Sequence, residues 1–93
     1  MWMTKYTLKT VGSGGAYISE LDSFTGLKRA RREAYSYVTD KYDMGPRRIY
    51  IDCDGDYLEG IVEKDIRYSR VTWHTDSGKY ILNSDGSLGR RIE

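Results

Sequence analysis

The feature that most constrains how this chain can fold is one segment with the periodicity of a helix. Short runs in which apolar and polar residues alternate lie on either side of it. Apolar residues recur at spacings of three and four, which is the pattern of a helix with one buried face: Leu27, Ala30, Ala34, Tyr37 and Val38. Asp22-Ser23-Phe24-Thr25 offers side chains able to cap the start. Gly45-Pro46 ends the segment, because proline lacks a backbone donor and restricts the residue before it. The spacing predicts one helix from Thr25 to Tyr42.

The remaining runs have the period-two alternation or the turn-bounded length of short strands. We expect strands at Thr4–Val11, Ala16–Leu21, Arg47–Asp52, Tyr57–Glu63, Arg70–Thr75, Lys79–Asn83 and Leu88–Ile92. Glycine-bearing turns separate them, at Gly12–Gly15, Asp54-Gly55, Asp76-Ser77-Gly78 and Ser84–Ser87, which favours an antiparallel meander. The predicted fold is therefore a single α+β domain over residues 1–93, in the order ββ-α-ββ-ββ(β). One antiparallel sheet of about five to seven short strands carries the amphipathic helix on one face.

Composition excludes several classes of protein. The formal net charge is only +1, whereas a general binder of polyanions is normally strongly basic. Cys53 is the only cysteine, so no internal disulfide can form and a disulfide-stapled secreted scaffold is excluded. No apolar run reaches the ~20 residues of a membrane-spanning helix, and the start lacks the apolar core of a signal peptide. These features predict a cytoplasmic protein without a membrane partner.

The near-neutral total conceals a split between a basic and an acidic segment. The basic segment carries Lys28, Arg29, Arg31 and Arg32 on the predicted helix. The acidic stretch Asp52–Asp65 lies among the predicted strands and turns, where its carboxylates can imitate a phosphate backbone. Tyrosines near it are expected on the sheet face without the helix, since tyrosine is enriched at protein interfaces. We therefore predict a protein-binding surface formed by Tyr50, Asp52, Asp54, Asp56, Tyr57 and Glu59.

The alternative hypothesis is direct binding of nucleic acid by the basic helix. Lys28 and Arg32 are one helical turn apart, with Arg29 and Arg31 on either side, and four cations can contact phosphates. A solvated outer face of the helix explains the same pattern. The chain also lacks the second helix of a helix-turn-helix reader.

Enzymatic motifs are weak. Asp52-Cys53-Asp54-Gly55-Asp56 resembles the start of a calcium loop, but glycine stands at the fourth position instead of the sixth and no exiting helix follows. Cys53 and His74 are the only cysteine and histidine, and they fall on different predicted strands. We therefore expect no catalytic residues, no metal site and no cofactor.

In overall style the chain resembles the small inhibitor proteins of phages and mobile elements, including anti-CRISPR proteins. That resemblance rests on no motif, so it assigns no role to any residue. It implies a non-enzymatic inhibitor whose partner is a host protein that handles nucleic acid. Either a monomer or a homodimer is compatible with the pattern of strands.

Overall fold

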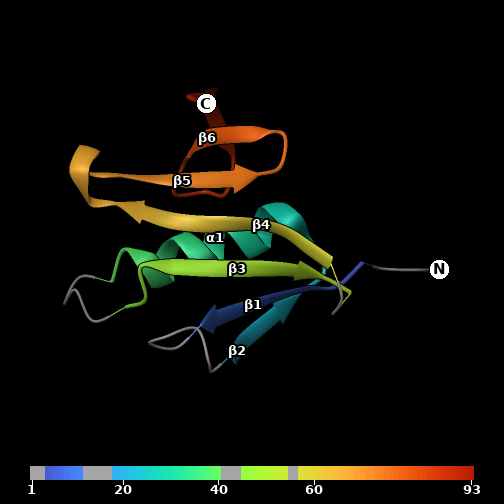
Figure 1. Cartoon of the computed structure of the whole chain (residues 1–93). Coiled ribbons are helices and arrows are strands. Elements are labelled where there is room, and N and C mark those ends of the chain that lie inside the picture. The colour runs from blue at the N-terminus through green and yellow to red at the C-terminus, as the bar shows by residue number, and fades with distance from the viewer. Residues whose placement is uncertain (1–3, 12–17, 41–44, 55–56) are drawn as a thin grey trace.

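A computed structural model describes residues 4–11, 18–40, 45–54 and 57–93 of the chain (Figure 1). It confirms the predicted fold class, with one helix on one antiparallel sheet of seven strands. The elements in chain order are β1 Tyr6–Val11, β2 Ile18–Phe24, α1 Leu27–Val38, β3 Arg48–Cys53, β4 Tyr57–Asp65, the short 3₁₀ helix η2 Ile66–Tyr68, β5 Arg70–Thr75, β6 Gly78–Leu82 and β7 Leu88–Arg91. The turn predicted at Gly12–Gly15 lies outside the described residues.

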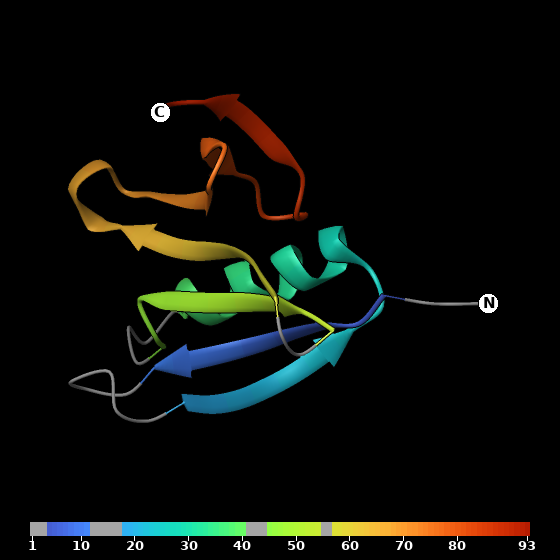
Figure 2. The same ribbon diagram turned by 45° about the vertical axis from the view of Figure 1, so that its right-hand side comes forward.

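The strand order across the sheet is β2-β1-β3-β4-β5-β6-β7, and every neighbouring pair is antiparallel. Both β2 and β3 flank β1, so they run in the same direction and cannot be joined by a tight turn. Helix α1 provides the crossover between them and lies across β1 to β4 on one face (Figures 1 and 2). Strands β6 and β7 lie beyond the helix, at the far edge of the sheet.

Helix α1 is shorter than the predicted span, and the predicted stripe is buried only in part, with Leu27 half-buried. Ala30, Ala34 and Val38 are buried against the sheet, whereas Tyr37 is 36% exposed. The prediction of a side-chain cap in the segment 22–25 was wrong, because Gly26 is the N-cap residue and no side chain bonds there. Instead β2 continues through Phe24, and the Ser23 hydroxyl pairs with that of Thr7 on β1.

The core lies between the helix and the sheet. Alternation within β3 points Ile49 and Ile51 toward the helix, where both are fully buried with Val62 of β4. Gly60 on β4 faces the Trp73 ring, and a Cβ there would lie 2.5 Å from the ring carbons. Glycine at this position therefore lets the indole lie flat against the backbone and extend the core toward β5.

A turn at the far edge of the sheet packs back onto the helix. Gly86, between β6 and β7, has a φ of +91°, and a Cβ there would lie 2.1 Å from the Lys28 carbonyl oxygen. Only glycine combines that backbone conformation with so close an approach. The turn thereby ties the C-terminal strands to the first half of α1.

Candidate protein-binding surface

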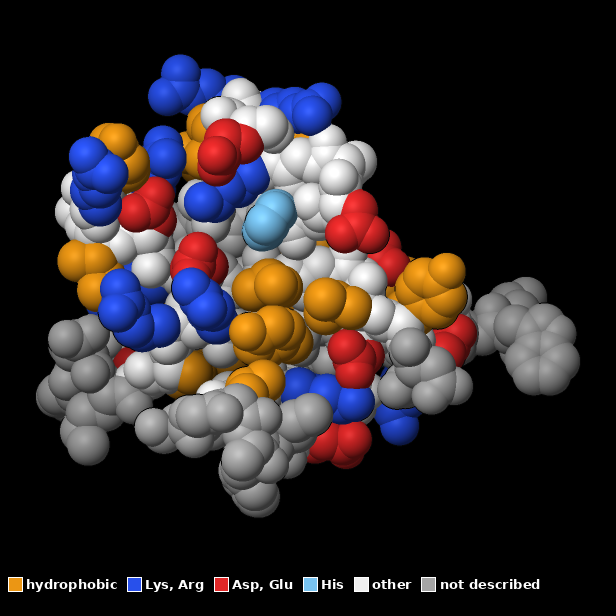
Figure 3. All heavy atoms as spheres, in the orientation of Figure 1, with side chains coloured by type: hydrophobic (Ala, Val, Ile, Leu, Met, Phe, Trp, Pro, Cys, Tyr) orange, Lys and Arg blue, Asp and Glu red, His pale blue; other side chains and the backbone are white. Residues whose placement is uncertain are grey.

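The helix covers one face of the sheet and leaves the other without a second layer. In Figures 1 and 3 the viewer looks onto this helix-free face, with α1 behind the sheet. Because side chains alternate along a strand, the residues between the buried isoleucines of β3 point outward here: Arg48, Tyr50 and Asp52. The same strands that build the core therefore also build an open surface.

Apolar side chains form a strip across the middle of this face. Tyr50, Ile61 and His74 are direct neighbours on β3, β4 and β5, and Leu58 follows beside Asp52. Leu58 is 53% exposed, while Tyr50 and Ile61 are partly exposed. Figure 3 shows apolar side chains gathered next to the pale-blue histidine. We call Tyr50, Leu58, Ile61 and His74 the sheet-face strip.

Ion pairs border the strip. The Lys9 ammonium contacts the Asp52 carboxylate at 2.5 Å, and Arg48 donates a hydrogen bond to Glu63. This bond and the charge of Glu63 raise the pKa of Arg48. The charges of these two pairs therefore cancel within the chain, so this part of the border carries little net charge.

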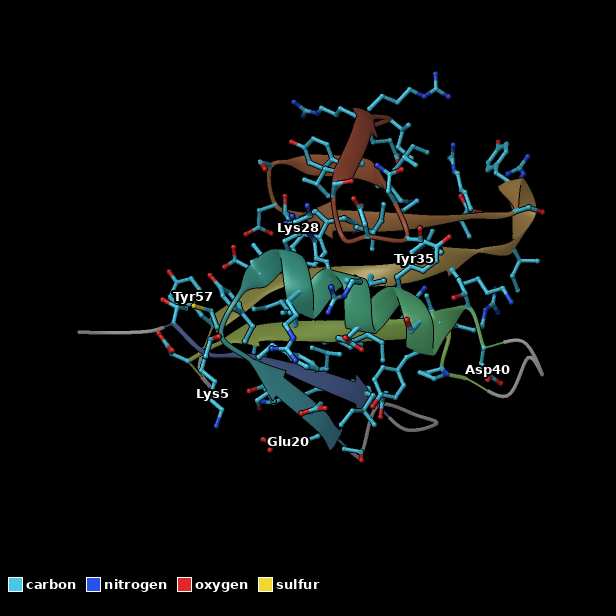
Figure 4. All side chains as sticks on the ribbon, turned by 180° about the vertical axis from the view of Figure 1, so that it is seen from behind. Lys5, Glu20, Lys28, Tyr35, Asp40 and Tyr57 are labelled. Carbon is cyan, nitrogen blue, oxygen red and sulfur yellow. The ribbon has the colours of Figure 1, made fainter. Side chains whose placement is uncertain are left out.

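Some of the predicted protein-binding residues surround the strip, and others do not. Tyr50 belongs to it, Asp52 borders it, and the carboxylate of exposed Asp54 accepts the Lys5 backbone N–H at 3.0 Å. Glu59 lies at a bulge of β4, where it lines a hollow with Leu58 and Ile61. It also acts electrostatically on Tyr6 and Arg31, which belong to the helix side. Tyr57 is 74% exposed at the end of the sheet where Lys5 lies (Figure 4). The predicted contact residue Asp56 lies outside the described residues.

Sequence reasoning missed three members of the strip: the apolar residues Leu58 and Ile61, and His74, which it considered only for catalysis. The sequence does contain a signal for Leu58 and Ile61, because β4 carries apolar residues at positions that point to both faces. A strand with one wet face normally alternates apolar and polar residues, so an apolar residue on the second face indicates contact with something else.

The basic helix does not present its four cations together. Lys28, Arg29 and Arg32 are exposed, and Arg32 pairs with its neighbour Glu33 at 3.3 Å.

Arg31 points to the sheet instead, where its Nε donates to the Gly86 carbonyl at 2.9 Å. Its guanidinium also lies over the Trp73 ring, 5.4 Å from the centroid. Burial lowers the pKa of Arg31, against the opposing charges of Glu59 and Tyr6. Arg31 thus joins the helix to the C-terminal strands.

The residues considered for catalysis lie apart. Cys53 shares the helix side of the sheet with its neighbour in register, Tyr6, whereas His74 points to the helix-free face. Desolvation raises the pKa of the Cys53 thiol, as do the charges of Asp54 and Glu59, which disfavours the reactive thiolate. Among the described residues, no three histidine, cysteine or carboxylate side chains are close enough to hold a metal ion.

Comparison with known proteins gives no family assignment. The chain matches no protein-family profile, no curated protein and no solved structure. Within the described part of the chain, no helix has the length and apolar character needed to cross a membrane.

Proposed function

We propose that this protein is a non-enzymatic binding module that docks a protein partner on the helix-free face of its sheet. The observation that carries the proposal is the sheet-face strip, with Leu58 53% exposed on a face that no described element covers. Protein interfaces have apolar and aromatic residues at the centre and polar residues around them. The strip and its bordering ion pairs have this arrangement.

Two hollows on either side of the strip give this face relief. One, of about 550 Å³, is lined by residues of β1, β3 and β4 that include Val11, Arg48 and Tyr50. The other, of about 290 Å³, lies between Leu58, Ile61 and His74. A partner can insert side chains into both hollows and cover the strip between them, as the anchor residues of protein interfaces do.

The chemistry of the partner follows from the charges at the Leu58 end of the strip. Glu59 and Asp76 line the hollow there, and exposed Asp54 follows β3 at the same end of the sheet. Such a carboxylate-rich end fits a basic surface. Proteins that handle nucleic acid carry basic surfaces, so we propose one of them as the partner, with inhibition by occlusion as the effect.

Site-specific photo-crosslinking tests the proposal. A benzophenone amino acid replaces Leu58 in one variant and Leu88, exposed on β7, in a matched control. We expect the Leu58 probe to crosslink one defined protein in cell extract and the Leu88 probe to miss it. Adding Ile61→Arg to the Leu58 probe should abolish that adduct. Equal labelling from both positions, or an adduct that survives Ile61→Arg, would refute this docking face. An adduct containing a second copy of the chain would replace the proposed partner by a homodimer.

A further inference from the structure

A second surface, at the opposite edge of the sheet from β2, gathers five cations that the sequence spreads over twenty-five positions. Strand pairing brings together η2, β5, β6 and β7 around a hollow of about 590 Å³. Its lining includes the exposed ring of Tyr68, and Arg67 extends the cluster from η2. We call Arg67, Arg70, Lys79, Arg90 and Arg91 the basic edge.

Acidic side chains neutralise only part of this charge. Asp65 pairs with Arg70 at 3.1 Å, and Glu93 pairs with Lys79 at 3.4 Å. Arg91 donates to the main-chain oxygens of Ser77 and Glu93, which fixes its guanidinium beside the hollow. Among the described side-chain carboxylates, none forms an ion pair with Arg67, Arg90 or Arg91.

The basic edge therefore differs in charge from the rest of the molecule. Its five cations and two carboxylates leave an excess of three positive side-chain charges. The whole chain carries +1, so the remainder carries a formal −2. Such a local excess attracts polyanions even when the total is near zero, because charges separated by more than about 10 Å are screened from one another in salt.

Tyr68 adds a feature that a simple anion site does not need. Tyr68 is 59% exposed at the edge of the hollow. The Arg70 guanidinium carbon lies 4.5 Å from the centroid of the Tyr68 ring, and that of Arg67 lies 5.5 Å from it. Exposed aromatic rings and guanidinium planes are the groups on which unpaired bases stack.

We propose that the basic edge binds single-stranded nucleic acid. Arg67, Arg90 and Arg91 contact successive phosphates, and a base stacks on Tyr68 and the guanidinium planes beside it. This surface adjoins the sheet-face strip only where Lys79 on β6 lies beside His74 on β5. The residues that carry the two proposals differ, so each proposal is tested by its own variants. A protein partner that handles nucleic acid is compatible with both, since the module then contacts the enzyme with one surface and its substrate with the other.

Fluorescence anisotropy with a labelled 12-nucleotide oligothymidylate measures this binding directly. Three to four phosphate contacts on a single strand should weaken affinity roughly 20- to 50-fold between 50 and 200 mM salt. Charge reversal in Arg67→Glu/Arg90→Glu should weaken binding at 50 mM salt by about tenfold or more. Tyr68→Ala should weaken it about fivefold, the effect of losing one stacked base, while Tyr68→Phe retains it.

The matched control is Lys28→Glu/Arg29→Glu, which makes the same change of charge on exposed residues of the helix. We expect this variant to bind nearly as tightly as the unchanged protein, and circular dichroism verifies that each variant is folded. Equal losses from both charge reversals would overturn the site in favour of unspecific attraction or the basic helix. Absence of binding at 50 mM salt, equal affinity for duplex DNA, or an unchanged affinity in Tyr68→Ala would also overturn the proposal.

Discussion

On the helix side of the sheet, Ile51 and Val62 are fully buried, while on the other side Tyr50 and Ile61 of the same two strands remain partly exposed. Each strand thus contributes alternate residues to a dry layer and to an open one. The helix side is filled by the apolar core and a single inward arginine. The helix-free side carries its apolar strip between ion pairs.

This difference separates the residues that hold the fold from those available for binding. Removing side-chain atoms from the helix side leaves a cavity, which costs free energy of unfolding. Truncating a half-exposed side chain on the other face removes less packing and lets water in. The open face can therefore carry binding residues at a small cost in stability.

The largest expected effect compares two isoleucines that point to opposite faces. We expect Ile51→Ala to lower the free energy of unfolding by about 3 kcal/mol, because the fully buried side chain leaves a cavity under the helix. The matched variant Ile61→Ala should lower it by about 1 kcal/mol or less. Urea denaturation followed by circular dichroism measures both values. Similar losses in the two variants would mean that the helix-free face is covered by further structure.

The helix and the strands were predictable because their signals are local. The stripe of Ala30, Ala34 and Val38 and the alternation around Ile49 each involve residues a few positions apart. The start of the helix was misjudged for a related reason. Ser23 has the chemistry of a cap, but its hydroxyl finds Thr7 on the neighbouring strand, sixteen residues away. Pairing between strands overrode the local preference.

Features that depend on pairing between distant segments could not be predicted from local sequence patterns. The charges of the basic edge are separated along the chain by turns and a hairpin, and only the register of β5, β6 and β7 brings them together. Arg31 is a further case, because its acceptor, the Gly86 carbonyl, lies 55 residues away. The spacing of charges on the helix identified the four cations, but it could not identify the one that turns inward.

An intermediate effect distinguishes the two sides of the helix itself. We expect Arg31→Ala to lower the free energy of unfolding by about 1–2 kcal/mol, through loss of the Gly86 hydrogen bond and the contact over Trp73. The control Arg32→Ala removes an exposed arginine paired with Glu33 and should change stability by about 0.5 kcal/mol or less. Thermal unfolding ranks the two variants. If Arg32→Ala were the more destabilising, the assignment of Arg31 as the link to the C-terminal strands would be wrong.

The smallest effect concerns pH and lies on the helix side of β1. Desolvation raises the pKa of the Tyr6 phenol above 10.0, and the nearby charges of Cys53, Glu59 and Asp54 add to this, although Arg31 opposes it. Above pH 10 the unfolded chain therefore releases the Tyr6 proton before the folded protein does, so the free energy of unfolding falls as pH rises. The stabilisation that the protonated Tyr6 phenol provides is fully present below pH 10. It is lost as the pH rises from there through the pKa of Tyr6 in the folded protein.

Replacing the Tyr6 phenol tests whether the free energy of unfolding falls with rising pH for this reason. In Tyr6→Phe the alkaline decline should be shallower, while the difference from the unchanged protein should stay constant between pH 7 and 9. Urea denaturation at intervals up to pH 11 gives the two curves. Parallel curves across the whole range would show that Tyr6 ionises equally in the folded and unfolded states. The end of β1 would then be as open to water as the helix-free face, and the contrast between the two faces would be confined to the centre of the sheet.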